Sequence, residues 1–137
     1  MPRDGGYDVF LSYSMKDRAW VSEFAQALRD AGVTAWFDVA ELMPGTRWKD
    51  EVEEALRASR FLVVILSPES VDSPWVFFEI GAAVADHKFI IPVVTEDLDV
   101  SRVPSLLQQY QFLREPSPTV AGRRVAEAIQ RTERDRA

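Results

Sequence analysis

The segment at residues 60–67 restricts the possible folds more than any other part of the sequence. Between Arg60 and Ser67 lie six consecutive apolar residues, in the order Phe, Leu, Val, Val, Ile and Leu. A strand with one face in water alternates apolar and polar side chains, whereas a strand covered on both faces is apolar along its whole length. We therefore predict a central strand of a parallel sheet with helices on both faces.

Other strand and helix patterns alternate along the chain around this central strand. Apolar and β-branched runs predict four more strands, at residues 7–14, 33–38, 88–95 and 111–113. Apolar side chains spaced three or four residues apart predict helices at about 20–30, 46–56, 74–85, 103–110 and 119–134. Pro92 removes a hydrogen-bond donor from its strand and favours a bulge or a sheet edge there. The alternation predicts an α/β fold, a doubly wound parallel sheet of five strands with helices on both faces.

Length and charge limit the organisation of the chain and its partners. We expect one domain at residues 7–131 in the 137-residue chain, preceded by a flexible lead at 1–6. The charged segment at 132–137 is either a tail or the point where a longer protein was cut. Sixteen basic and twenty-two acidic side chains give a formal net charge of −6, without any concentrated basic run. This balance argues against nucleic acid or an anionic membrane as the main partner.

Cysteine and histidine content excludes several kinds of site. The chain has no cysteine and one histidine, so disulfides, thiol nucleophiles and the common zinc sites are excluded, and we expect no metal. No apolar run approaches the roughly 20 residues of a membrane-spanning helix. We therefore expect a soluble protein of the cytoplasm.

Glu79 is the strongest candidate for a reacting group. It is the only ionisable residue between Pro74 and Ala85, in a helix that Ser73 and Pro74 are suited to begin. Trp75 lies four residues earlier and therefore on the same face of that helix. A carboxylate in such apolar surroundings costs free energy unless it contacts water, a hydrogen-bond donor or a cationic ligand. Ligands of open parallel sheets bind beyond the carboxyl ends of the strands, where this helix is expected to begin.

Four segments in order resemble the Toll/interleukin receptor family, the TIR domains, over about residues 7–130. Residues 7–14 (Tyr-Asp-Val-Phe-Leu-Ser-Tyr-Ser) are similar to the first strand of that family, 36–45 to its second strand and the loop that follows, and 60–68 to its third strand. Trp75 and Glu79 match the tryptophan-x-x-x-glutamate pattern of the members, of bacterial type, that cleave NAD⁺.

This resemblance implies a fold and a reaction. The fold is a flavodoxin-like sheet, and the reaction cleaves the nicotinamide–ribose bond of NAD⁺ to give nicotinamide plus ADP-ribose or a cyclic ADP-ribose isomer. Glu79 takes the position of the catalytic glutamate, and Trp75 takes that of the pocket tryptophan. NAD⁺ is then a substrate, and no resident cofactor is expected.

The resemblance also implies that copies of the domain assemble. We expect activation by head-to-tail contacts between identical TIR domains, in immune or cell-death-type defence signalling such as antiviral defence. Leu42, Met43, Pro44 and Gly45 belong to the loop after the second strand, where exposed apolar side chains suggest a contact surface. A heterologous contact of this kind builds filaments or open arrays.

Four other candidates for the substrate site each have a structural alternative. Ser12 and Ser14 can line the nicotinamide end of the pocket, or they can bond local amides at the end of their strand. Asp38 can contact ribose or cap the loop after its strand. Trp48 can line the pocket or pack in the core.

Further residues favour a structural role alone. We expect Trp20 and Trp36 in the core and Ser67 as the cap of the turn that begins at Pro68. We expect His87 to face solvent or to contact the end of its helix.

Two other functions remain open at this point. The chain can be a non-catalytic TIR interaction module that acts by TIR–TIR assembly. It can also be an enzyme similar to nucleoside deoxyribosyltransferases, which use a glutamate against a ribosyl carbon.

Overall fold

The computed structural model describes residues 7–36, 54–68, 70–71, 81–85, 87–96 and 98–136. Its strands form one five-stranded sheet in the order β2-β1-β3-β4-β5, with every neighbouring pair parallel. This order is the flavodoxin-like one, so the predicted α/β fold with a doubly wound sheet is confirmed. The strands are β1 (Tyr7–Ser12), β2 (Ala35–Trp36), β3 (Ser59–Leu66), β4 (Phe89–Val94) and β5 (Leu113–Arg114).

Strand β3 lies at the centre of the sheet, as its sequence predicts. Phe61 pairs in register with Val9 of β1 on one side and with Phe89 of β4 on the other. The six apolar residues of β3 are 0–1% exposed. Both its backbone and its side chains are therefore removed from water.

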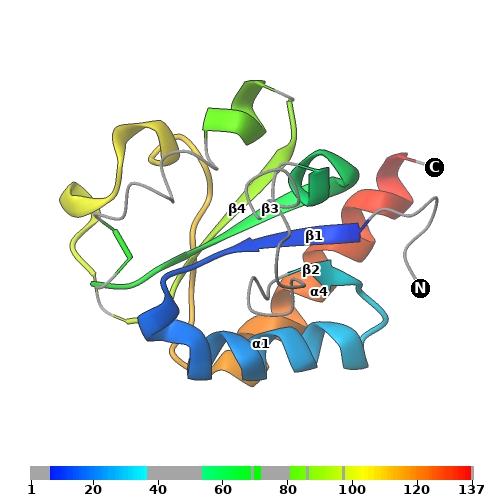
Figure 1. The fold of residues 1–137 in the computed structure, drawn as a ribbon, viewed down its shortest axis with the longest axis horizontal. Coiled ribbons are helices and arrows are strands. Elements are labelled where there is room, and N and C mark those ends of the chain that lie inside the picture. The colour runs from blue at the N-terminus through cyan, green and yellow to red at the C-terminus, as the bar shows by residue number, and fades with distance from the viewer. Residues whose placement is uncertain are drawn as a thin grey trace, which may run out of the picture.

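Two apolar clusters cover the two faces of the sheet. On one face, alternate strand residues such as Val63 pack against α1 (Arg18–Asp30) and α4 (Pro118–Arg136). On the other face, their neighbours such as Val64 pack against the helical segments 54–58 and 81–85 and against residues 98–107. Figure 1 shows α1 and α4 together on one side of the strands and the shorter segments on the other.

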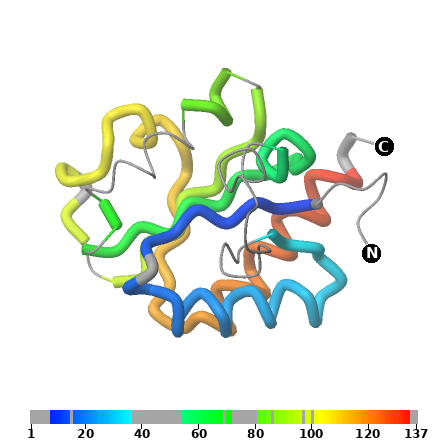
Figure 2. The backbone as a smooth tube through the Cα atoms, in the orientation of Figure 1, coloured from blue at the N-terminus to red at the C-terminus, as the bar shows by residue number. Residues whose placement is uncertain are grey.

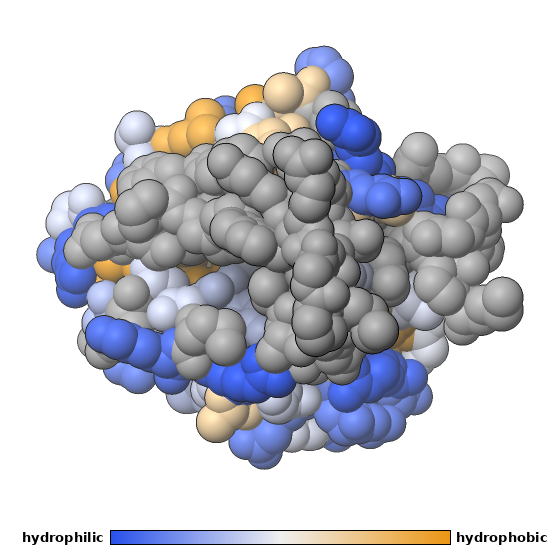
Figure 3. Space-filling view, viewed as in Figure 1, coloured by the Kyte–Doolittle hydropathy of each residue, from blue (hydrophilic) through white to orange (hydrophobic). Residues whose placement is uncertain are grey.

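Helix α1 has the amphipathic character predicted from its apolar spacing. Val21, Phe24 and Leu28 are buried against the sheet. Figure 3 shows a largely hydrophilic surface over α1, where the exposed residues are Ala19 and four polar or charged ones, Glu23, Gln26, Arg29 and Asp30.

The helices end as their last residues predict. Gly32 has φ 87° just past α1, and its amide donates to the Arg29 carbonyl at 2.9 Å. His87 adopts φ 57° after the helical segment 81–85, with its amide bonded to the Val84 carbonyl at 3.1 Å. His87 is exposed, as expected for the end of its helix.

One predicted element is wrong. The single helix expected at 103–110 is replaced by two short 3-10 helices, η4 (Val100–Arg102) and η5 (Ser105–Leu107). Pro104 lies between them with ψ 136°, an extended conformation, and its ring nitrogen cannot donate a helical hydrogen bond. A continuous helix through this position is therefore excluded.

Other boundaries differ by a few residues from those expected. Strand β1 ends at Ser12, two residues earlier than predicted, while α4 continues to Arg136 and so includes residues 132–136 of the charged segment. Only Val93 and Val94 of β4 pair with β5. Pro92 precedes these two residues. Among the described residues, β4 therefore pairs only with β3 at Pro92.

An ion-pair network ties four segments together at the amino edge of the sheet. Arg60 of β3 contacts Asp8 of β1 at 2.7 Å and Glu133 of α4 at 3.0 Å. The second Asp8 oxygen accepts hydrogen bonds from the Thr34 amide and hydroxyl at 3.0 and 3.1 Å. Figure 2 shows the last turns of α4 beside the start of β1, where these contacts form.

The network changes the acidity of Asp8. Burial raises the pKa of its carboxyl, but the hydrogen bonds from Thr34 and Arg60 and the charge of Arg60 together outweigh burial. The net pKa of Asp8 lies below its ordinary value of 3.8. Asp8 therefore contributes stability that is fully present above about pH 4 and is lost as pH falls through its lowered pKa.

Helices α1 and α4 approach each other closely at Gly122. A Cβ atom at this position would lie 2.5 Å from the Ala27 Cβ and 2.7 Å from the Phe24 carbonyl oxygen, both on α1. Only glycine fits without displacement of one helix.

We predict that Gly122→Ala lowers the stability of the chain. Overpacking of this kind costs about 1–3 kcal/mol, and the gain of about 1 kcal/mol in helix propensity offsets only part of it. Gly81→Ala is the matched control, because an added Cβ there has no neighbour within 4 Å, and it should stabilise by about 0.5–1 kcal/mol. Urea unfolding of both variants measures the effects, and a Gly122→Ala protein as stable as wild type would contradict the close packing.

We predict that Asp8→Asn destabilises the chain by roughly 1–2 kcal/mol at pH 7, because charge-assisted hydrogen bonds are lost. The difference from wild type should shrink below about pH 4, where the wild-type carboxyl also becomes neutral. Chemical unfolding at pH 7, 5, 4 and 3 checks this expectation. A difference that stays constant over this range would mean that the charge of Asp8 does not stabilise the fold.

Candidate functional site

Hydroxyl side chains follow the three central strands at the carboxyl edge of the sheet. Ser12 ends β1, Ser67 follows β3 and Thr95 follows β4, and these residues are 1%, 1% and 5% exposed. The Thr95 amide donates to the Leu66 carbonyl at 3.1 Å, so the ladder between β3 and β4 continues to this rim. Ligands of open parallel sheets bind beyond this edge.

Ser12 and Ser14, two predicted substrate-site residues, lie in different surroundings. Ser12 is almost completely buried, whereas Ser14 is half-buried. The Ser14 hydroxyl accepts a hydrogen bond from the Lys16 amide at 3.3 Å, and its carbonyl accepts one from the Asp17 amide at 2.8 Å. Ser14 therefore has the local amide contact that we weighed as the alternative to substrate binding.

The remaining predicted site residues lie outside the described residues. These are Glu79, Trp75, Asp38 and Trp48, together with the loop residues Leu42, Met43, Pro44 and Gly45. In the sequence, the described residues closest to Glu79 are Val71 before it and Gly81 after it. Their roles stay predictions.

The two tryptophans expected in the core are only partly buried and pack against its surface. Trp36 stacks on Phe10 with ring centroids 5.1 Å apart. Trp20 stacks on Phe24 at 5.4 Å, and its indole nitrogen donates to the Pro116 carbonyl at 2.8 Å. This bond joins α1 to the connection between β5 and α4.

A tight hydrogen-bonded cluster follows β3 at the same edge. Ser67 accepts hydrogen bonds from the Ser70 amide through its hydroxyl at 3.2 Å and its carbonyl at 3.1 Å. The Ser70 hydroxyl accepts from the Ser67 amide at 3.0 Å and donates to the Ile65 carbonyl at 2.7 Å. Ser67 therefore caps the turn after Pro68, as predicted. The Ser67 hydroxyl also donates to Asp17 at 2.6 Å, a contact that sequence analysis missed.

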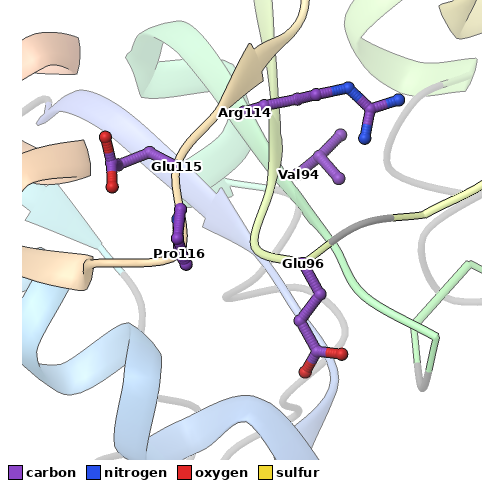
Figure 4. Close-up of a pocket in the computed structure, with 5 residues that line it drawn as sticks. All are labelled: Val94, Glu96, Arg114, Glu115 and Pro116. Carbon is purple, nitrogen blue, oxygen red and sulfur yellow. The ribbon is translucent and has the colours of Figure 1, made fainter.

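A hollow of about 270 Å³ lies where β4 and β5 end. It is lined by Val94, Glu96, Arg114, Glu115 and Pro116. Figure 4 shows that the side chains of Arg114 and Glu115 point to opposite sides of the chain, and that Glu96 points away from both. Arg114 donates to the Leu98 carbonyl at 3.1 Å, and Glu115 accepts from the Ser117 amide at 3.1 Å. The charged groups do not converge on one point, so this hollow lacks the arrangement of a reaction centre.

Asp17, which sequence analysis missed, gave only a weak local signal. It directly precedes an apolar helical pattern, which predicts a helix cap. In the part of the chain that the structure describes, no group of three or more acidic or histidine side chains is arranged to hold a metal ion. Among the described helices, none has the length and apolar composition needed to cross a membrane.

Comparison with known proteins decides the family. The family model described as TIR domain matches residues 9–128, most of the chain. The chain belongs to the TIR domain family.

The TIR domain of the Toll-related receptor TRR-2 from Hydra magnipapillata matches 90% of this chain over 98% of its own length. Its TM-score is 0.75 and its sequence identity 22%. A chain of the RPS4 and RRS1 TIR domain heterodimer covers 90% of this chain, and 96% of that chain is matched. Its TM-score is 0.69 and its sequence identity 17%. These structures support the fold.

Curated relatives have higher sequence identity but are longer. The 2′ cyclic ADP-D-ribose synthase BtTIR of Bacteroides thetaiotaomicron is 32% identical over 108 residues, which are 73% of this chain and 38% of the relative. The NAD(+) hydrolase PdTIR of Paracoccus denitrificans is 34% identical over 70 residues, 50% of this chain and 23% of the relative. The TIR chain thus spans less than half the length of each.

Proposed function

We propose that this TIR domain is an NAD⁺ glycohydrolase that cleaves the nicotinamide–ribose bond, with Glu79 as the catalytic residue. The pattern of Trp75 and Glu79 in an otherwise apolar segment carries the proposal. Curated relatives at 32% and 34% identity are named as a 2′ cyclic ADP-D-ribose synthase and an NAD(+) hydrolase, which supports it. The product is ADP-ribose when water accepts the ribosyl group. It is a cyclic ADP-ribose isomer when the acceptor is a hydroxyl or base nitrogen of the same molecule.

The chemistry of the substrate explains how a single carboxylate can suffice. Most glycoside hydrolases need a second carboxyl group that protonates the leaving oxygen. Nicotinamide leaves from a pyridinium cation as a neutral molecule, so no proton has to be delivered. Glu79 can hydrogen-bond the ribose hydroxyls and stabilise the positive charge at the ribosyl carbon, or attack that carbon directly. Trp75 offers a flat face to the pyridinium ring, a contact of roughly 1–2 kcal/mol.

The described residues on either side of the proposed catalytic segment support its placement on the sheet. Residues 72–80, which include Trp75 and Glu79, connect the turn after β3 to the helical segment 81–85. Val71 before them and Ala83 after them belong to the same apolar cluster. Val71 lies at the carboxyl edge, whereas Ala83 accepts the Lys88 amide at 3.0 Å just before β4 begins at the amino edge. The proposed catalytic segment therefore connects two residues that pack on the same face of the sheet.

We further propose that activity depends on self-assembly. In this proposal the domain works in the cytoplasm in a defence pathway, and the loop with Leu42 and Met43 contacts a neighbouring copy head to tail. A solved TIR heterodimer with the same fold supports association between such domains. The loop follows β2 and therefore leaves the sheet at the same edge as the segment with Glu79, so a neighbour that orders it can complete the pocket.

We predict that Glu79→Gln lowers the rate of nicotinamide release by at least about 100-fold, because the charge that stabilises the transition state is lost. Stability should be unchanged or slightly higher if the Glu79 carboxylate is held without a partner for function, since the change removes a charge from an apolar segment. Glu96→Gln is the matched control, an exposed carboxylate at the same edge, and should retain activity. Mass spectrometry identifies the products formed from NAD⁺. The same assay with a deoxynucleoside plus a free base tests the alternative reaction, deoxyribosyl transfer. Near-wild-type turnover by Glu79→Gln would exclude the mechanism.

We predict that the rate per chain rises with protein concentration over about a hundredfold range, because more chains acquire a partner. Leu42→Asp should abolish the rise, since a charge on an apolar contact opposes association. Leu106→Asp is the control, because Leu106 is 41% exposed on η5 and lies outside the loop. Nicotinamide release and light scattering at matched concentrations measure both effects. A rate per chain that stays flat would show a self-sufficient monomer.

A further inference from the structure

The side chain of Asp17 bonds to a residue that is distant in the sequence and does not cap its own helix. It occupies the N-cap position of α1, but its side chain makes no capping hydrogen bond. An aspartate at this position usually accepts a bond from an amide of the first helical turn, which stabilises the helix. Here the carboxylate accepts a hydrogen bond from the Ser67 hydroxyl at 2.6 Å, 50 residues along the chain. A short bond to an ionised acceptor is among the stronger hydrogen bonds in proteins.

The partner of Asp17 is a buried and constrained side chain. Ser67 is 1% exposed, and its hydroxyl oxygen already accepts the Ser70 amide. Its single proton is therefore the group that reaches Asp17, and this bond sets the rotation of the hydroxyl. Because the same oxygen receives the Ser70 amide, the orientation of Ser67 and the geometry of the turn are coupled.

The turn held in this way leads into the proposed catalytic segment. Ser70 and Val71 both donate their amides to the Ser67 carbonyl at 3.1 Å, and both side chains are buried. The chain passes from Val71 to Glu79 in eight residues. The turn therefore fixes Val71, the last described residue before this segment.

We propose that Asp17 is a positioning residue for NAD⁺ cleavage, acting through Ser67 on the turn that leads to Glu79. This inference rests on the proposed function. Asp17 itself need not touch the substrate. It links the start of α1 to Ser67 after the central strand, so the start of α1 and the turn keep a fixed relation at the carboxyl edge of the sheet. A displacement of about 1 Å in a reacting group is enough to reduce a rate about a hundredfold.

Single and double variants test the link between the two side chains. Asp17→Ala and Ser67→Ala should each lower kcat about tenfold or more, with KM for NAD⁺ changed less than about threefold. The double variant should be no slower than the slower single variant, because each single variant already lacks the hydrogen bond between the two side chains. Ser67→Thr, which keeps the hydroxyl, should retain most of the rate. Multiplicative losses in the double variant, or kcat unchanged in both single variants, would overturn the proposal.

Two controls separate positioning from general destabilisation. Gly122→Ala weakens the packing of α1 on α4 away from the carboxyl edge, and Asp30→Ala removes an exposed carboxylate at the other end of α1. Both should keep wild-type kcat at a temperature where they remain folded. If Gly122→Ala loses kcat as strongly as Asp17→Ala at equal melting temperature, the role of Asp17 is only structural.

Hydrogen exchange in the absence of NAD⁺ tests the positioning without turnover. The Ser70 and Val71 amides should exchange at least about tenfold faster in Asp17→Ala, while amides of β3 keep their protection. Unchanged exchange at these two amides would overturn the inference. If the wild-type chain releases no nicotinamide, the proposed function is wrong, and this exchange measurement alone decides whether Asp17 orders the turn.

Discussion

Strand β3 lies between hydrogen-bonded neighbours on both sides and between apolar clusters on both faces. Its paired neighbours are β1 and β4, and its side chains alternate between the two clusters. A polar side chain at any of its six central positions would be buried without water and would cost free energy unless it found a partner. The packing of α1 and α4 on one face and of the shorter helices on the other therefore depends on the apolar character of this strand.

The polar side chains of the three central strands are consequently confined to the two ends of these strands, and the two ends differ in chemistry. The amino edge carries the ion pairs of Arg60 with Asp8 and Glu133, which hold a helix against two strands. The carboxyl edge carries the buried hydroxyls of Ser12, Ser67 and Thr95. Charge at the amino edge serves cohesion, whereas the side chains that end the three central strands at the carboxyl edge are small, neutral hydroxyls.

Sequence analysis could predict what depends on local periodicity. The uninterrupted apolar run of β3, the apolar spacing of α1 and the glycine at the end of α1 each have one physical explanation, and each is confirmed. The break at Pro104 was missed because apolar spacing around it imitates a helix. The bond between Asp17 and Ser67 could not be predicted, because the local preference of an aspartate before a helix is to cap it. Glu79 and Trp75 rest on the resemblance and on their apolar setting, so variants of these residues are the direct test.

The length of β5 has a consequence for how copies of this chain can associate. Only Leu113 and Arg114 form this edge strand, and the chain then turns away, held by the bond from Trp20 to Pro116. A long exposed edge invites strand addition from another molecule, whereas two residues offer a very short template. At this border, joining of sheets between molecules is therefore disfavoured. Contacts between copies at this border would instead use loops and helix surfaces, which can separate again without disrupting a continuous intermolecular sheet.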